Sequence, residues 1–155
     1  MYFILFIPFL KFYNKFPYRN NKFLYLKNNI INLINNDKIL NHNCNIYYES
    51  RIKTENKILY KIKKNKIPID IYGLRIIYSL NDDKKSNDYA YYIQNIIENK
   101  YFTLNYFYDD YIKYPKKNNY QGIHMYIYNE ILMEIQIRDI EMHYNAVNGT
   151  ASNYY

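Results

Sequence analysis

The chain has 155 residues, a net charge of +7 and 49% hydrophobic residues, a length that suits one domain with its own core. The single cysteine, Cys44, excludes an internal disulfide and a cysteine-based zinc cluster, and the three histidines show no metal-ligand spacing. The positive charge favours an anionic partner such as nucleotide phosphates, RNA or acidic lipid, although AT-rich coding DNA would also over-supply Lys, Asn, Ile and Tyr.

The first 36 residues contain no acidic residue, but they contain five basic ones. The apolar run 2–10 is interrupted by Pro8 and is far shorter than the roughly 20 residues of a membrane-spanning helix, so no transmembrane segment is expected. An apolar run followed by a basic stretch predicts an organelle leader of plastid type over 1–21, with the folded domain over 22–155. An ordinary N-terminal helix or strand in a cytoplasmic protein explains these residues equally well.

Hydrophobic periodicity predicts the elements that follow. Leu and Ile at helical spacing predict an amphipathic helix over 22–40 and then a loop over 41–45. Residues 45–53 have extended character, and Thr54 is a candidate N-cap for a helix to about residue 64. A buried strand over 74–80, a polar turn over 81–88, a helix over 89–99 and a strand over 102–108 come next.

The residue pattern over 125–149 predicts a β-hairpin followed by a helix. Residues 125–128 and 131–138 form the hairpin around Asn129 and Glu130, and a short helix over 141–147 ends at Gly149. The alternation of helices and strands predicts an α/β (α+β) fold, in which a mixed β-sheet is flanked by helices.

Rarer residue types are ordered in the segment 111–138. A Pro-Lys pair leads into Tyr120 and His124, and the strand after them carries Glu134, Gln136 and Arg138 on one face, with isoleucines on the other. Three polar residues on one face of an apolar strand form either an exposed edge or the floor of a cleft. His124 is either a phosphate donor or a structural imidazole.

Two carboxylates are candidates for metal-assisted phosphoryl chemistry. Asp70 precedes the strand over 74–80, and Glu134 lies on another strand, which suits Mg²⁺ with substrate phosphates as its other ligands. Lys53, Lys61 and Lys116 can offset phosphate charge, while Glu134 can position an attacking hydroxyl. The lysines spaced three and four apart over 53–64 form either a solvated basic face or a phosphate cradle.

These residues resemble the synthetase domain of the RelA/SpoT family, which makes the alarmones ppGpp and pppGpp. The resemblance is tightest at 51–61, 70–77, 109–124 and 134–149, and it implies a nucleotidyltransferase-like mixed sheet flanked by helices. It implies a Mg²⁺-dependent transfer of the β,γ-diphosphate of ATP to the 3′-hydroxyl of GDP or GTP, with AMP as the second product.

The resemblance also implies a role for each matching residue. In SRIKT and DIYGLR, it implies ATP binding by Arg51, Lys53, Lys61 and Arg75, with the two arginines around the adenine. Asp70 and Glu134 are implied as the catalytic carboxylates and Mg²⁺ ligands, and Glu134 as the residue that activates the 3′-hydroxyl. Guanine-nucleotide binding is implied for Lys116, Asn118, Tyr120, His124 and Gln136, with Tyr120 stacked on the guanine.

A few positions depart from the family pattern. The family commonly has Ser at the position of Gly122 and often Ser at that of Lys57. Phe107 replaces the leading Glu of the acidic substrate-loop motif, and Asn153-Tyr154 stands where His-Trp is usual. The family's hydrolase domain, with its His-Asp metal motif, has no counterpart in these residues.

Two other classes of function compete with synthesis. One is a catalytically degenerate domain that only binds guanine nucleotides, against which the retention of both Asp70 and Glu134 argues. The other is a basic RNA-binding module, against which the lack of clustered Arg argues. ATP and GDP or GTP are therefore the expected partners, and no stable nucleic-acid partner is expected.

Overall fold

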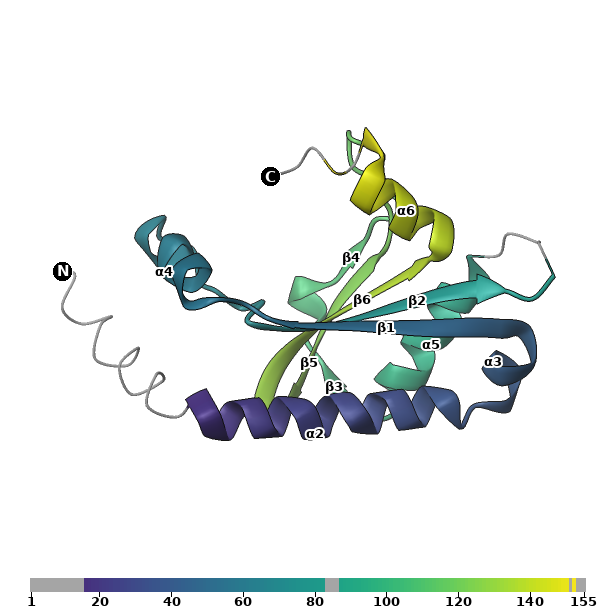
Figure 1. The fold of residues 1–155 in the computed structure, drawn as a ribbon, viewed down its shortest axis with the longest axis horizontal. Helices are drawn as coiled ribbons and strands as arrows, with labels where there is room; N and C mark the ends of the chain where they lie inside the picture. Colours follow the sequence, from purple (N-terminus) through teal and green to yellow (C-terminus); the bar gives the residue numbers. More distant parts are fainter. Residues whose placement is uncertain (1–15, 83–86, 151, 153–155) are drawn as a thin grey trace.

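The computed structural model describes residues 16–82, 87–150 and 152 of the protein (Figure 1). Its elements run in the order α2 (Phe16–Asn35), α3 (Lys38–Asn43), β1 (Cys44–Ile52), α4 (Glu55–Lys63), β2 (Tyr72–Leu80), α5 (Asp88–Glu98), β3 (Phe102–Thr103), the 3-10 helix η1 (Asn105–Phe107), β4 (Asp109–Asp110), β5 (Ile123–Asn129), β6 (Ile131–Asp139) and α6 (Ile140–Asn148). None of the helices in these described ranges combines the length and hydropathy needed to cross a bilayer. Of the predicted leader, residues 1–15 lie outside the described residues, and 16–21 belong to α2.

One mixed sheet organises the fold, as predicted. Its strand order is β1-β2-β6-β5-β3, and β4 also pairs with β5. β2 and β6 are parallel, whereas the other pairs are antiparallel. In Figure 1, α2 and α5 cover one face of this sheet, α6 lies over the other, and α4 projects beyond the end of β1. The face between α4 and α6 is thus left for a site.

The core lies between the sheet and the α2–α5 layer. Helix α2 places an apolar residue on this side at every turn, and Phe23 stacks on Tyr72 of β2 with 5.1 Å between ring centroids. Ile93 and Ile97 of α5 are fully buried against the same face. The buried residues that α2 and β6 bring together are Phe23, Leu26, Ile30, Ile34, Met133, Ile135 and Ile137. The long strands β2, β5 and β6 therefore each pack one apolar face in the core and leave the other face for chemistry.

The prediction of a single helix over 22–40 followed by a loop is wrong. Helix α2 ends at Asn35, and Asp37 caps a second helix, α3, through bonds of 3.0 Å from the Ile39 amide and 2.9 Å from the Leu40 amide to its carboxylate. Asp accepts the free amides at a helix start, so it begins a new helix here. Residues 41–43 are consequently helical, and β1 begins directly at Cys44.

The predicted strand over 102–108 is also wrong over most of its length. Only Phe102 and Thr103 pair with β5, after which the chain turns through η1. Asn105, a poor strand former, begins that turn, and Tyr106 points into solvent. The two acidic residues Asp109 and Asp110 then return to β5 as the separate strand β4.

The remaining predicted elements are confirmed within a few residues at their ends. Thr54 is the N-cap of α4, although its side chain makes no capping hydrogen bond. The β5–β6 hairpin turns at Glu130, which has a positive φ of 60°. Helix α6 ends at Gly149, as predicted, and it begins after Asp139, whose carboxylate caps it, one residue earlier than the predicted start. Of the polar turn predicted over 81–88, residues 83–86 lie outside the described residues.

Candidate active site

Strand register aligns the polar candidates in two rows across the sheet. The first row consists of Arg51, Gly73, Glu134 and Tyr126, and the second of Glu49, Arg75, Gln136 and His124. On each strand the two rows are two residues apart, so both lie on the same face, opposite the core. Glu134, Gln136 and Arg138 are 5%, 9% and 2% exposed on the inner strand β6. The face of β6 that carries these three side chains is therefore the floor of a cleft rather than an exposed edge.

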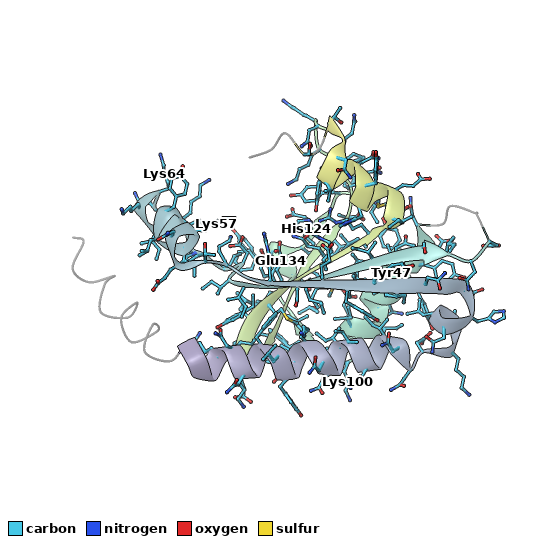
Figure 2. All side chains as sticks on the ribbon, viewed as in Figure 1. Tyr47, Lys57, Lys64, Lys100, His124 and Glu134 are labelled. Carbon is cyan, nitrogen blue, oxygen red and sulfur yellow. The ribbon has the colours of Figure 1, made fainter. Side chains whose placement is uncertain are left out.

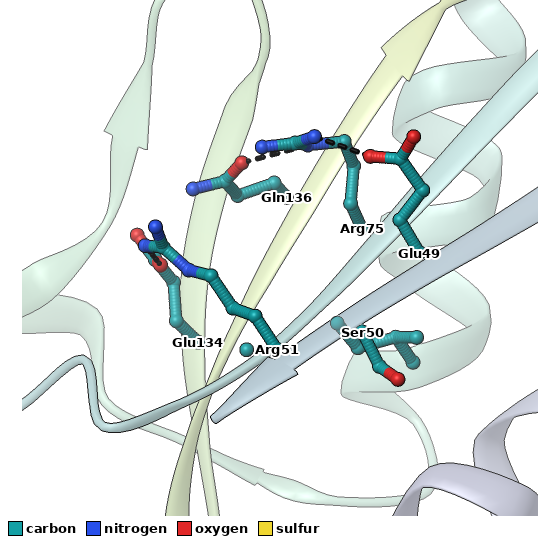
Figure 3. A pocket seen from close by; sticks show the side chains of 8 residues that line it. Glu49, Ser50, Arg51, Arg75, Glu134 and Gln136 are labelled. Atoms are coloured by element: carbon teal, nitrogen blue, oxygen red, sulfur yellow. Dashed lines mark hydrogen bonds and ion pairs between the residues drawn. The ribbon is translucent and has the colours of Figure 1, made fainter. Parts of the chain in front are cut away.

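A pocket of about 100 Å³ opens on this floor (Figure 3). In Figure 3, Arg51 extends over Glu134, and Arg75 lies between Gln136 and Glu49. The structure therefore brings Arg51 and Arg75 to the wall of one pocket. The residues that line it are Glu49, Ser50, Arg51, Gly73, Leu74, Arg75, Glu134 and Gln136.

Asp70 is held at one end of the cleft by cations. Lys61 Nζ lies 2.8 Å from its Oδ1, and Lys53 Nζ binds Oδ2. Burial by itself would raise the pKa of Asp70, but the hydrogen bonds and charges of the two lysines lower it to about 2. Burial lowers the pKa of Lys53, with the nearby Lys61 acting in the same direction against the opposing effect of Asp70. Asp70 is therefore an anion at any physiological pH.

Glu134 is the second ionised carboxylate of the cleft. His124 Nδ1 lies 3.2 Å from its Oε1, and Arg51 Nη2 lies 3.3 Å from its Oε2. Figure 2 shows His124 and Glu134 on the same side of the sheet. Burial would raise the pKa of this carboxyl, but the hydrogen bond and charge of His124, followed by the charge of Arg51, lower it to about 2.

The two carboxylates are linked through one guanidinium. Arg51 Nη2 is 3.9 Å from Asp70 Oδ2 as well as 3.3 Å from Glu134 Oε2, so a cationic group already lies between them. Across the described parts of the chain, no three His, Cys, Asp or Glu side chains gather into a metal-binding group. Two carboxylates alone fit Mg²⁺, which takes its other oxygen ligands from water and substrate phosphates.

Gly73 leaves open space on the cleft floor between Arg51 and Glu134. It stands between them in the first row, and a Cβ added to it would lie 3.4 Å from both Cγ and Nε of Arg51 and 3.9 Å from Glu134 Oε2. The missing side chain therefore leaves space on the cleft floor.

Gln136 lies between two arginines. Its Oε1 accepts hydrogen bonds from Arg75 Nε at 3.2 Å and from Arg138 Nη2 at 2.8 Å. Arg75 also pairs with Glu49, on the far side of the pocket. The resemblance implies that Gln136 binds the guanine nucleotide. In the structure, its oxygen connects Arg75, on the predicted ATP side of the cleft, to Arg138.

The predicted acceptor residues gather in the loop before β5. The Lys116 amide donates to the Tyr120 carbonyl at 3.1 Å, and Asn118 Oδ1 accepts from the Tyr120 amide at 3.3 Å, so the loop folds back on itself. Lys116 Nζ is 5.2 Å from the centroid of the Tyr120 ring. The Tyr120 hydroxyl is 2.5 Å from His124 Nε2. This contact joins the loop to Glu134 through His124.

The lysine stripe divides into two site residues and a solvated part. Lys53 and Lys61 reach Asp70, whereas Lys57 on α4 and Lys64 just after its end are exposed (Figure 2). Lys64 Nζ lies 5.8 Å from the ring centroid of Tyr60, on the last turns of α4. Only Lys53 and Lys61 of the stripe are therefore placed to meet substrate phosphates.

Residue patterns missed several groups that shape the cleft. Glu49 pairs with Arg75 and lies 3.7 Å from His143, and Tyr111 packs edge-on against Tyr120 and His124. Arg138 is predicted to share a strand face with Glu134 and Gln136, but no role is predicted for it. Its signal was its rarity, because this lysine-rich chain has only four Arg. Glu49 shares a strand face with Arg51, a two-residue spacing that could have identified it.

Comparisons with known proteins show the family and the fold of the chain. A sequence model described as the region found in RelA / SpoT proteins matches residues 50–155. An Arabidopsis thaliana protein named "Probable GTP diphosphokinase CRSH, chloroplastic" is 34% identical over 116 residues, which cover 68% of this chain and 20% of that protein. This chain therefore spans about a fifth of the length of that relative.

Solved structures share the fold. The small alarmone synthetase 1 of Bacillus subtilis has a TM-score of 0.67 at 23% identity, over 90% of this chain and 76% of that one. A GTP pyrophosphokinase family protein of Streptococcus pneumoniae has a TM-score of 0.71 at 21% identity, over 94% and 77%. The sheet and its flanking helices are thus those of alarmone synthetases. Because the family model matches well over half of its residues, this chain belongs to the nucleotide-utilising RelA/SpoT family.

Proposed function

We propose that this chain is a GTP/GDP pyrophosphokinase, which transfers the β,γ-diphosphate of ATP to the 3′-hydroxyl of GDP or GTP and releases AMP. The observation that carries the proposal is the pair of ionised carboxylates, Asp70 and Glu134, between a cationic pocket and an aromatic loop. The names of relatives support it, because one is a GTP diphosphokinase, and the B. subtilis synthetase has been solved bound to its product pppGpp.

ATP would occupy the β1–β2 side of the cleft. Arg51 and Arg75 share a pocket wall, where planar guanidinium groups can stack on adenine. Lys53 and Lys61 concentrate positive charge at Asp70, where a triphosphate needs it. The acceptor would occupy the other side, with its guanine on Tyr120 and its phosphates near Lys116.

Asp70 and Glu134 would hold Mg²⁺. Both are ionised oxygen donors, and a guanidinium already lies between them, so the position accepts a cation. When bound, the ion would neutralise charge on the phosphate oxygens during transfer.

In the transfer step, the acceptor 3′-oxygen forms a bond to the β-phosphorus of ATP, and the bond from that phosphorus to the α,β-bridging oxygen breaks. The electron pair leaves with AMP. Glu134 accepts the hydrogen bond of the 3′-hydroxyl and orients it in line with the phosphorus. With a pKa of about 2, Glu134 is a weak base, so orientation is its main contribution. The hydroxyl proton departs along this hydrogen bond.

A direct assay tests the reaction. The purified chain is incubated with labelled ATP, GDP or GTP, and Mg²⁺, and the products are separated. We expect AMP together with a guanosine tetra- or pentaphosphate. For Glu134→Gln, which keeps the shape but loses the charge, we expect product formation to fall by about 10²–10⁴-fold with ATP binding largely intact. Undiminished synthesis by this variant would exclude Glu134 from the step.

The same assay separates the two competing functions. A degenerate guanine-nucleotide-binding domain binds GDP but releases no AMP, and its Glu134→Gln variant behaves like the parent chain. An RNA-binding module binds RNA with a steep dependence on salt and needs no nucleotide. The Lys57→Gln variant is a suitable control, because Lys57 is exposed on α4 and should leave synthesis unchanged.

The proposed location is a plastid-type organelle. It is supported by the word chloroplastic in the name of the plant relative and by the acid-free, basic character of the first 36 residues. A fluorescent protein fused to the C-terminus of the whole chain, imaged in plant cells, tests it. Diffuse cytoplasmic fluorescence would contradict it.

A further inference from the structure

Arg138 is a buried cation without a carboxylate partner. The side chain is 2% exposed, and none of the ion pairs among the described residues includes it. Nη2 donates to Gln136 Oε1 at 2.8 Å, but Nε has no hydrogen-bond partner although it is buried. An arginine that is buried in this way is costly, and a hydrophobic side chain of similar length would fill the space more cheaply. Its retention points to a contact that needs the guanidinium.

That contact is the ring of Tyr120. Arg138 Cζ lies 5.2 Å from the ring centroid, within the range in which a cation is attracted to an aromatic face. The attraction is strongest where water is excluded, as it is around Arg138. The ring is also fixed at its edges, because its hydroxyl lies 2.5 Å from His124 Nε2 and Tyr111 packs against it in a T-shaped pair.

Gly122 keeps the path between these two residues open. A Cβ at this position would lie 3.7 Å from Arg138 Cβ and 3.8 Å from the Tyr120 hydroxyl, and 3.3 Å from the Ile137 carbonyl. The backbone φ of +148° is also one that glycine adopts far more easily than other residues. The chain therefore passes close to β6 here, and Tyr120 can settle onto Arg138.

We propose that Arg138 is a positioning residue for the acceptor nucleotide. Gln136 orients the guanidinium of Arg138. The guanidinium in turn holds the Tyr120 ring on the cleft floor in the orientation that stacking of the guanine requires. The proposal deepens the proposed function and rests on it, because it requires Tyr120 to be the ring that receives the guanine. Arg138 touches no substrate itself and acts through Tyr120.

A double-mutant cycle tests this role. The variants are Arg138→Met, Tyr120→Ala and their combination, and the full chain is titrated calorimetrically with GDP and, separately, with a non-hydrolysable ATP analogue. We expect Arg138→Met to weaken GDP binding about tenfold, the scale of a desolvated cation–π contact, and to leave the ATP analogue within about twofold. With Tyr120 already replaced by Ala, Arg138→Met should cause no further loss of GDP affinity.

Two more variants keep the test decisive. Arg138→Lys retains a buried cation and should recover part of the GDP affinity, and this variant carries the test if Arg138→Met does not fold. Arg19→Met, the same change on α2 behind the sheet, should alter neither affinity.

Additive losses in the cycle, or equal losses for GDP and the ATP analogue, overturn the role of Arg138. If Tyr120→Ala alone leaves GDP affinity unchanged, the stacking role of Tyr120 fails first, and the proposal for Arg138 falls with it.

Discussion

Three of the four arginines of this lysine-rich chain share one face of the sheet. Arg51, Arg75 and Arg138 project from three different strands into the same cleft. Each uses the planar guanidinium in contacts that a lysine would reproduce only in part. Arg51 spans two carboxylates, Arg75 bonds to Gln136 and Glu49, and Arg138 lies against an aromatic ring. Their chemistry thus explains why Lys has not replaced them.

The substitution Gly73→Ala should lower the catalytic activity without lowering the thermal stability. The backbone of Gly73 has no positive φ, so Ala is allowed there, and Gly73→Ala should leave the melting temperature unchanged or slightly raised. Its methyl group would occupy the cleft floor in van der Waals contact with Arg51, 3.4 Å away. We expect kcat/KM for ATP to fall about tenfold, because Arg51 loses room to adjust around ATP.

Steady-state kinetics and thermal unfolding check this prediction together. Ser79→Ala, a small change farther along the same strand, is the matched control and should alter neither quantity. Full activity in Gly73→Ala would show that Arg51 does not need the open space. A large fall in melting temperature would show that Gly73 serves the fold instead.

Sequence patterns identified the chemistry of the cleft better than its contacts. The two-residue spacing in β6 correctly predicted that Glu134, Gln136 and Arg138 share a face. It could not show that the Gln136 oxygen lies between Arg75 and Arg138, because that contact depends on which strand lies beside β6 and on side-chain rotamers. A strand pattern specifies a face but not its neighbours.

At the level of elements, the break between α2 and α3 depends on Asp37. The Asp37→Ala substitution removes the carboxylate that accepts hydrogen bonds from two helix amides. It also removes the acceptor of the Tyr92 hydroxyl, which lies 3.1 Å from Asp37 Oδ2. Losing such a cap costs about 1 kcal/mol, with a range of about 0.5–2. In a domain of this size the melting temperature should fall by about 2–4 °C per kcal/mol.

Differential scanning calorimetry measures this effect. Lys38→Ala, at the next residue, retains the cap and should shift the melting temperature far less. Alarmone synthesis at 25 °C should be unchanged in both variants, because α3 lies at the end of the sheet away from α4 (Figure 1) and contributes no residue to the pocket. An Asp37→Ala protein as stable as the parent would contradict the capping role.

Helix periodicity alone could not reveal this break. Ile34 and Leu40 are both fully buried, and apolar spacing continues across them as if the helix did. The distinguishing signal was the polar run Asn35-Asn36-Asp37, which combines turn formers with a capping residue. The strand predicted over 102–108 was wrong for the opposite reason. Its four aromatic residues favour a strand, but at Asn105 the chain leaves β5, and Tyr108 contacts Gln94 of α5.

For the molecule as a whole, the cleft carboxylates couple folding to pH. Asp70 and Glu134 have pKa values of about 2 in the folded chain, below their ordinary values of 3.8 and 4.5. A lowered pKa stabilises the fold above the unfolded value, and that stabilisation is lost as the pH falls through the folded value. We therefore expect these groups to contribute fully above about pH 5 and progressively less between about pH 4.5 and 2.

Melting temperatures from pH 7 to 2.5 check this dependence. Asp70→Asn leaves Lys53 and Lys61 without their carboxylate, so this variant should melt below the parent chain at pH 7. The gap should narrow as the parent's Asp70 is protonated in acid. Parallel curves for the two proteins across this range would show that Asp70 is not stabilised by its lysines.

The place of β6 in the sheet governs when this site can form during synthesis on the ribosome. Among the described residues β6 is the last strand in sequence, yet it lies between β2 and β5 in the sheet. Until residues 131–139 emerge from the exit tunnel, β2 and β5 have no strand to join them, and Arg51 has no Glu134 to meet. Pairing over such long sequence separations is slow. The nascent chain should therefore carry its apolar strand faces uncovered until β6 has been made, which makes chaperone contact most important before the β5–β6 hairpin forms.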